Sequence, residues 1–252
     1  MSGHSKWATI KRKKGAADAK RGQVFTRLTR EIVMAARDGG GDPDSNFRLR
    51  LAVEKARSQN MPKENIERAI KRGSGEGKDG VVYEQVFYEG YGLHRVAMMI
   101  ECVTENRNRT IAEVRHLLSR SGGNLGEAGS VAWQFKYMAY FAVPSAGTTF
   151  DKVFEIAVEN GADDVTEDGD IIEILAPVES FKTISDGLHA AKIMPEEAEL
   201  KMIPTQEVEL NVDQTLQVLK QVEVIEELDD VQNIFHNLKI SEEAMAALES
   251  EE

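Results

Sequence analysis

The feature that most constrains this chain is a change of hydrophobic periodicity at a glycine-rich segment. Residues 74–80 read Ser-Gly-Glu-Gly-Lys-Asp-Gly, a composition typical of a flexible linker. Before this segment apolar residues recur at helical spacing, and after it they form runs rich in β-branched and aromatic residues, as strands do. The chain has 252 residues, about twice the common domain length, so two or three domains are expected.

Three short helices are predicted before the linker. An apolar residue at every fourth position predicts the first helix over residues 16–37. Asp42 and Pro43 resemble an N-cap followed by proline at the first helical position, so the second helix is expected to start there. Pro62 opens a third helix, which Gly73 ends.

After the linker the pattern predicts two α/β domains. Residues 136–205 show the order strand, helix, strand, strand, helix, strand, which is the ferredoxin-like arrangement. Residues 81–135 and 206–252 together complete a second α/β sandwich, and residues 131–135 are expected to form one of its strands. The predicted fold class is therefore α+β with three domains. A small helical domain with its linker spans residues 1–80, and two ferredoxin-like α/β domains follow, one inserted in the other.

Charge is divided unequally between these parts. The net charge is −12, yet residues 1–80 carry 19 Lys/Arg and 10 Asp/Glu, whereas residues 81–252 carry 12 and 33. Residues 1–37 alone hold ten basic side chains and two acidic ones. A basic segment on an acidic body is expected of a polyanion-binding protein. The same pattern also fits a basic face that docks on the acidic body of its own chain.

No constellation of residues indicates catalysis. The five histidines are scattered, and none stands at zinc-ligand spacing from Cys102. A nucleophile elbow and a dinucleotide-binding glycine pattern are absent. We therefore expect a protein that is not an enzyme and uses no metal, cofactor or small-molecule substrate. A single cysteine, no apolar signal region in residues 1–9 and no membrane-length apolar run predict a cytoplasmic protein without membrane contact.

The basic N-terminal region is the predicted contact with nucleic acid. Lysine and arginine neutralise phosphates and release counterions, which gives affinity without sequence preference. The candidate residues are Lys6, Lys11, Arg12, Lys13, Lys14, Lys20 and Arg21. Trp7 could stack on an unpaired base, or it could equally pack on the first helix. Arg27 and Arg30 would extend the phosphate track along that helix, although a solvated face is the usual meaning of such spacing.

A second candidate lies where a predicted strand leads into a helix. Arg107 and Arg109 could hold a phosphate there, because a helix N-terminus offers free N–H groups and a positive dipole end. The alternative, which we favour, is a capping segment. In that case Asn108 caps the helix and the arginines pair with Glu105 or Glu113.

Five ordered blocks, spread over most of the chain, carry a specific resemblance. They are Gly3-His4-Ser5-Lys6-Trp7, Pro62-Lys63-Glu64-Asn65-Ile66-Glu67-Arg68-Ala69-Ile70, Tyr88-Glu89-Gly90-Tyr91-Gly92, Asn106-Arg107-Asn108-Arg109-Thr110 and Gly122-Gly123-Asn124-Leu125-Gly126. Together they resemble the YebC/PmpR family. The resemblance implies a helical domain and two α/β domains, the last inserted in the middle one. One departure is plain: where members often continue the third block with Pro-Gly-Gly, this chain has Leu93-His94-Arg95.

The resemblance also implies a function, which has been described in two ways. Bacterial members are labelled DNA-binding transcriptional regulators, and mitochondrial relatives are described as translational activators associated with the ribosome or its message. We therefore predict a nucleic-acid-binding regulator of gene expression, with duplex DNA as the first target and ribosomal RNA or the ribosome as the alternative. A protein-interaction scaffold is the second alternative. The sequence indicates neither the target sequence nor the oligomeric state.

Overall fold

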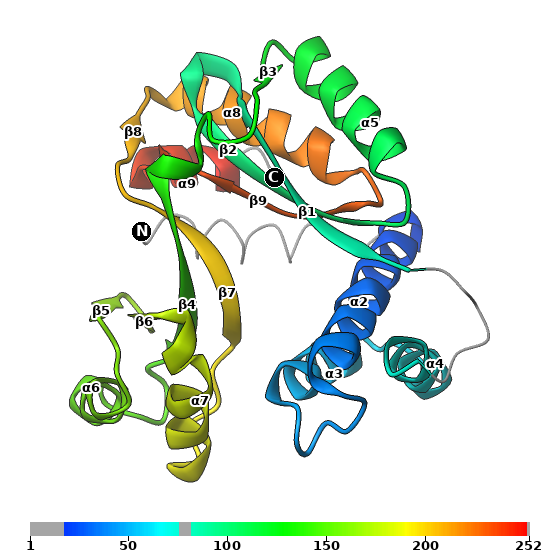
Figure 1. Ribbon diagram of the computed structural model, residues 1–252. Helices are drawn as coiled ribbons and strands as arrows, with labels where there is room; N and C mark the ends of the chain where they lie inside the picture. Colours follow the sequence, from blue (N-terminus) through cyan, green and yellow to red (C-terminus); the bar gives the residue numbers. More distant parts are fainter. Residues whose placement is uncertain (1–17, 76–81, 251–252) are drawn as a thin grey trace. The chain divides into compact units, whose positions relative to one another are not determined.

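The computed structural model describes residues 18–75 and 82–250 (Figure 1). The chain divides into two compact units, one comprising Phe135–Thr205 and the other the described residues on either side of it. Helices alone precede the first described strand, and helices and strands follow it, so the predicted α+β class is confirmed. Within the described residues, no helix combines the length and the apolar content needed to cross a membrane.

Three described helices form the first part of the larger unit. They are α2 (Asp18–Gly39), α3 (Phe47–Ser58) and α4 (Lys63–Gly73). Helix α2 packs against both of the others, because its apolar stripe faces inward. The shared core contains Leu28, Ile32, Val33, Leu49, Val53, Ala56, Ile66 and Ala69. The stripe predicted for the first helix is therefore its core-facing side.

The start of α3 differs from the prediction. Asn46, not Asp42, is the N-cap: its side-chain oxygen accepts a hydrogen bond from the Leu49 amide at 3.1 Å. Its side-chain nitrogen donates to the backbone oxygens of Ala35 and Gly40, at 2.8 and 2.7 Å. Asn46 is buried, so both ends of its amide need partners. A carboxylate could cap α3 but could not also donate to the end of α2.

An antiparallel sheet forms the α/β part of the larger unit, in the strand order β3-β1-β2-β9. The bounds are β1 (Glu84–Tyr91), β2 (Ala97–Thr104), β3 (Asn124–Leu125) and β9 (Val231–His236). Helices α5 (Arg107–Arg120), α8 (Val212–Glu226) and α9 (Glu242–Ser250) share its core. Alternate residues of β2, namely Met98, Ile100 and Cys102, point into that core, as the pleat requires. The short strands β8 (Val208–Glu209) and β10 (Leu238–Lys239) pair in parallel.

The smaller unit has the predicted ferredoxin-like order. Its elements are β4 (Phe135–Pro144), α6 (Phe150–Glu159), β5 (Asp164–Asp168), β6 (Ile171–Ala176), α7 (Phe181–Ala190) and β7 (Glu197–Pro204). The strands pair antiparallel in the order β5-β6-β4-β7, which two crossing helices produce. The expected strand at residues 131–135 is wrong: a 3₁₀ turn, η2 (Ala132–Gln134), leads directly into β4.

The loop that departs from the family pattern joins β1 to β2. His94 and Arg95 have φ values of 54° and 62°, in the left-handed region that glycine adopts without strain. A Pro-Gly-Gly sequence would place its two glycines at these positions. Here the loop is held on α8 instead: the Leu93 amide donates to Gln221 Oε1 at 2.8 Å, and His94 Nε2 lies 2.9 Å from Gln217 Oε1.

Candidate nucleic-acid interface

Arg27 and Arg30, predicted to extend a phosphate track, face acidic residues of the same unit. The Arg30 side chain is 9% exposed, its Nη2 lies 2.8 Å from Asp230 Oδ1, and its Nη1 donates to the Asp229 carbonyl. Arg27 is half-buried, and this burial lowers the pKa of its guanidinium. The positive charge of Arg30 lowers the pKa further, whereas the negative charge of Asp229 raises it without reversing the shift. In this structure α2 thus docks on the acidic body at these two positions. Contact of Arg30 with phosphate would require it to leave Asp230.

Asp230, the residue before β9, is the centre of this arrangement. Its side chain is 4% exposed, and its Oδ2 accepts from Thr110 Oγ1 at 2.6 Å and from Arg109 Nη2 at 2.9 Å. Thr104 Oγ1 donates to the same oxygen at 3.1 Å. Burial would raise the pKa of Asp230, but these hydrogen bonds and the two arginine charges outweigh it and lower the pKa. The carboxylate therefore stays ionised and joins α2 to the start of α5.

The start of α5 is a capping segment, as the favoured alternative predicted, but with a different cap. Asn106 rather than Asn108 is the N-cap, and its side-chain oxygen accepts from the Arg109 amide at 3.1 Å. Arg107 Nε lies 2.6 Å from a carboxylate oxygen of Glu84 on β1. Arg109 pairs with Asp230, as described above, and more distantly with Glu105, at 3.8 Å. Both arginines thus already have carboxylate partners, although each remains partly exposed.

Most basic side chains described in α3 and α4 also have partners. The ion pairs are Arg48–Asp38, Lys55–Glu31 and Lys63–Glu67, with N–O distances of 3.1, 3.3 and 3.6 Å. The Arg72 guanidinium lies over the ring of Tyr83, 4.7 Å from its centroid. Exposed Arg57 and Lys71 have no ion-pair partner within residues 22–75 and 82–248. The described helical region therefore presents mixed charge rather than an unbroken basic track.

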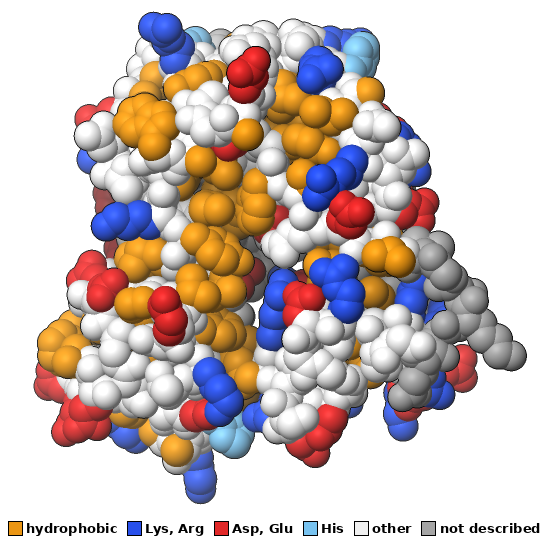
Figure 2. Space-filling view, in the orientation of Figure 1, with side chains coloured by type: hydrophobic (Ala, Val, Ile, Leu, Met, Phe, Trp, Pro, Cys, Tyr) orange, Lys and Arg blue, Asp and Glu red, His pale blue; other side chains and the backbone are white. Residues whose placement is uncertain are grey.

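The remaining N-terminal candidates are not placed by the structure. Lys6, Trp7, Lys11, Arg12, Lys13 and Lys14 lie outside the described residues. Lys20 and Arg21 belong to α2 by their backbone, and their side chains are not described. On the face that Figure 2 shows, Lys and Arg side chains are scattered among Asp and Glu and form no single basic field.

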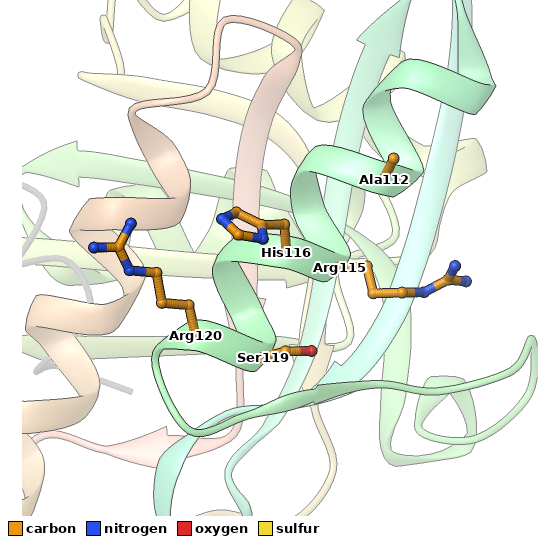
Figure 3. A pocket seen from close by; sticks show the side chains of 5 residues that line it. All are labelled: Ala112, Arg115, His116, Ser119 and Arg120. Atoms are coloured by element: carbon orange, nitrogen blue, oxygen red, sulfur yellow. The ribbon is translucent and has the colours of Figure 1, made fainter.

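A basic face that we did not predict lies on the outside of α5. An open hollow of about 530 Å³ is lined by Ala112, Arg115, His116, Ser119 and Arg120. Figure 3 shows Arg115 and Arg120 extending to opposite sides of the helix, with His116 and Ser119 between them along its axis. All five residues are exposed, and neither arginine has an ion pair with another described residue. Projecting residues 107–120 on a helical wheel would have revealed this face, which the acidic total of residues 81–252 concealed.

Glu89, in the third family block, organises the segment that leads to the smaller unit. Its carboxylate accepts backbone N–H bonds from Gly129 at 2.7 Å and from Val131 and Ala132 at 2.8 Å each. Burial would raise the pKa of Glu89, but these three donors outweigh it and lower the pKa. The loop so held carries Trp133, whose side chain is an exposed aromatic surface that we also did not predict.

Within the described residues, no group of three or more His, Cys, Asp or Glu side chains is arranged to hold a metal ion. Cys102 is buried in the core of the larger unit, and burial raises the pKa of its thiol well above the usual range. The charges of Asp230 and Glu101 act in the same direction, so the thiol is held in its protonated, less nucleophilic form.

Comparison with known proteins places the chain in a family. The model of the "TACO1/YebC protein N-terminal domain" matches residues 5–76, and that of the "TACO1/YebC second and third domain" matches residues 83–238. A relative from Geotalea uraniireducens is 51% identical over 97% of this chain and 98% of its own length. One from Acidithiobacillus ferrooxidans is 52% identical over 99% of both chains. Each bears the name "probable transcriptional regulatory protein".

A solved structure agrees with these matches. The crystal structure of a conserved hypothetical protein from Aquifex aeolicus has a TM-score of 0.78 and 40% sequence identity to this chain. The likeness covers 89% of this chain and 93% of that one. The resemblance drawn from five sequence blocks is therefore confirmed, and the chain belongs to the TACO1/YebC family.

Proposed function

We propose that this chain is a cytoplasmic, non-enzymatic regulator of gene expression that binds duplex DNA through the basic side chains of its N-terminal region. The observation that carries the proposal is the segregation of charge. Residues 1–37 hold ten basic and two acidic side chains, on a chain whose net charge is −12. The name shared by relatives about 50% identical, "probable transcriptional regulatory protein", supports a role in regulation.

Basic side chains that already have partners within the chain are weaker candidates for phosphate contact. Arg27 and Arg30 lie against Asp229 and Asp230, and most described basic residues of α3 and α4 have internal partners. The proposal therefore rests mainly on residues 1–21, which include Lys6, Lys11, Arg12, Lys13, Lys14, Lys20 and Arg21. Lysines and arginines there would neutralise phosphates, and the net negative charge of residues 81–252 would disfavour DNA contact over most of the remaining surface.

Structured RNA, such as that of a ribosome, is the second candidate target. The surface of α3 and α4 favours it, because the ion pairs Lys55–Glu31 and Lys63–Glu67 place carboxylates among the basic side chains that a groove-reading helix would present to DNA. A protein that grips phosphates without reading base edges serves either polymer. The scaffold alternative predicts no nucleic-acid affinity at physiological salt.

The test compares the full-length protein with a variant in which Lys11, Arg12, Lys13 and Lys14 are glutamine. In a control variant Lys152, Lys182, Lys192 and Lys220 are glutamine, so the protein loses the same amount of positive charge outside the N-terminal region. Binding to a duplex DNA and to a structured RNA is measured at several salt concentrations, with each polymer also used as competitor. If the four residues contact phosphates, the slope of log affinity against log salt should fall by up to about 3.6 for duplex DNA.

The outcomes separate the hypotheses. A reduced slope in the arm variant and an unchanged slope in the control support the proposal. Tighter binding to RNA that duplex DNA does not compete away makes the protein an RNA-directed factor. An unchanged slope in the arm variant contradicts the assignment of the arm, and the absence of binding to either polymer leaves the scaffold hypothesis.

A further inference from the structure

We propose that the outer face of α5 is a second DNA-contact surface, which lies along the major groove of duplex DNA with Arg115 and Arg120 on the two flanking backbones. This inference rests on the proposed function, because it assumes that the protein binds duplex DNA. It assigns the contact to the α/β part of the larger unit, far along the sequence from the basic N-terminal region.

The distribution of arginine is the first argument. Residues 81–252 contain five arginines, and four of them lie in the fourteen residues of α5, together with one carboxylate, Glu113. Arg107 and Arg109 are paired with Glu84 and Asp230, and the charge of Glu113 acts on Arg109. Arg115 and Arg120 have no such partner among the described residues, so their charge is available to a ligand.

The helical spacing of these residues is the second argument. At about 100° per residue, Arg115 projects about 60° to one side of Ala112, and Arg120 projects about 80° to the other side. His116 and Ser119 project between the two arginines, as Figure 3 shows, and Ala112 leaves the centre of the face low. The outer face of α5 thus has small or polar side chains along its centre and one guanidinium group along each edge.

This form fits a polyanion better than a small molecule. Enclosed pockets bury most of a small ligand, whereas the hollow on α5 is open to solvent. A guanidinium donates two parallel hydrogen bonds to one phosphate, so Arg115 and Arg120 can each bind the phosphate backbone of one DNA strand. Ser119 and His116 can donate to a phosphate or to a base edge between them.

The choice of duplex DNA follows from groove dimensions. A helix with its side chains is about 10–12 Å wide, and the major groove of B-DNA is about 12 Å wide. The major groove of an RNA duplex is too deep and narrow for a helix to approach. The opposite side of α5 is buried through Val114 and Leu118, so the helix would lie at the mouth of the groove with its outer face inward.

The test uses full-length Arg115→Gln/Arg120→Gln protein and, as a matched control, Lys152→Gln/Lys220→Gln. Affinity for a duplex DNA and for an RNA duplex of equal length is measured between about 50 and 200 mM salt. Loss of two phosphate contacts should lower the slope of log affinity against log salt for DNA by about 1.8. When the salt concentration rises fourfold, the factor by which affinity falls should therefore be about tenfold smaller for the variant than for the wild type. Ala112→Glu, which puts a carboxylate in the centre of the face, should weaken DNA binding more than Ala112→Gln does. All substituted positions are exposed, and unchanged thermal unfolding confirms that the fold is intact.

Each outcome has one meaning. A reduced DNA slope with an unchanged RNA slope and an unchanged control supports the α5 surface. Equal losses on DNA and RNA overturn its assignment to the major groove. If the α5 variant binds like the wild type while the Lys11–Lys14 variant is impaired, the α5 inference fails and the proposed function stands. If the wild-type protein binds no duplex DNA, the proposed function itself fails, and the α5 inference with it.

Discussion

Replacing Asp230 with alanine should destabilise the larger unit, because it removes the acidic partner of a buried arginine. The side chains of Arg30 and Asp230 are 9% and 4% exposed, and their charged atoms lie 2.8 Å apart. Removing one member of a buried ion pair costs about 3–5 kcal/mol, since the remaining charge has no counter-charge and little water.

The contacts around Arg30 and Asp230 determine where the loss of stability should fall within that range. Arg30 would keep its hydrogen bond to the Asp229 carbonyl and its position over the Tyr83 ring, 5.6 Å from the centroid, which favours the lower end. Thr104 and Thr110 would lose their shared acceptor, which adds to the cost. Arg109 is 43% exposed, so its contribution is at most about 1 kcal/mol. We expect a loss of about 3–4 kcal/mol in the free energy of unfolding.

Urea unfolding measures this change. The control is Asp186→Ala, which removes the exposed partner of Lys182 on α7 and should cost no more than about 0.5 kcal/mol. A double-mutant cycle with Arg30→Met isolates the pair. In the absence of Arg30, removal of Asp230 should cost at least about 1.5 kcal/mol less than in the wild type. A cost below about 1 kcal/mol for Asp230→Ala, or additive costs in the cycle, would refute the assignment of Arg30 and Asp230 as a stabilising buried pair.

Three further predictions concern single positions. Glu89→Gln should cost about 2 kcal/mol, because an amide cannot accept all three backbone N–H groups. The pKa of Glu89 is below its ordinary value of 4.5, so the stability it supplies is complete above pH 4.5 and is lost as pH falls through the lower folded-state value. Urea unfolding from about pH 6 to pH 3 should therefore show a shallower acid loss in Glu89→Gln than in the wild type. Burial raises the pKa of the Cys102 thiol, so iodoacetamide at about pH 8 should label it after unfolding and not before, as mass spectrometry would show. Arg95→Gly should raise the free energy of unfolding by about 0.5 kcal/mol and Arg95→Ala should not, because glycine alone relieves the strain of φ 62°. Equal effects of the two substitutions in urea unfolding would show that this backbone strain is absent.

Local signals predicted most elements. The apolar stripe of α2, the helix α6 and the hairpin between β5 and β6 depend on side chains close together in the sequence, and the structure confirms them. The misplaced start of α3 has a different cause. Asn46 was missed as the cap of α3 because its advantage over Asp42 lies in two hydrogen bonds to the end of another helix. Because these bonds join two helices, the sequence around Asn46 alone does not indicate them.

The candidate site was less predictable for the same reason. Whether Arg30 meets phosphate or carboxylate depends on Asp230, 200 positions away in the sequence. The sequence allowed both outcomes, and the fold placed Arg30 against the carboxylate. The face formed by Arg115 and Arg120 was predictable in principle, because helical spacing alone brings these residues to one side of α5. The net negative charge of residues 81–252 hid it, because a segment with so many acidic residues is not expected to bind a polyanion.

The insertion of one unit into another has a consequence for the order in which a newly made chain can fold. All strands of the smaller unit lie between residues 135 and 205, so this unit can close as soon as that stretch has left the ribosome. The sheet of the larger unit must wait for β9, and its core must wait for α8 as well. Asp230 emerges with them, so Arg30 and Arg109 are synthesised long before the carboxylate with which both form ion pairs. In a nascent chain, Arg30 of α2 therefore lacks the partner that it has in the finished protein, and the junction of α2 with α5 is among the last to form.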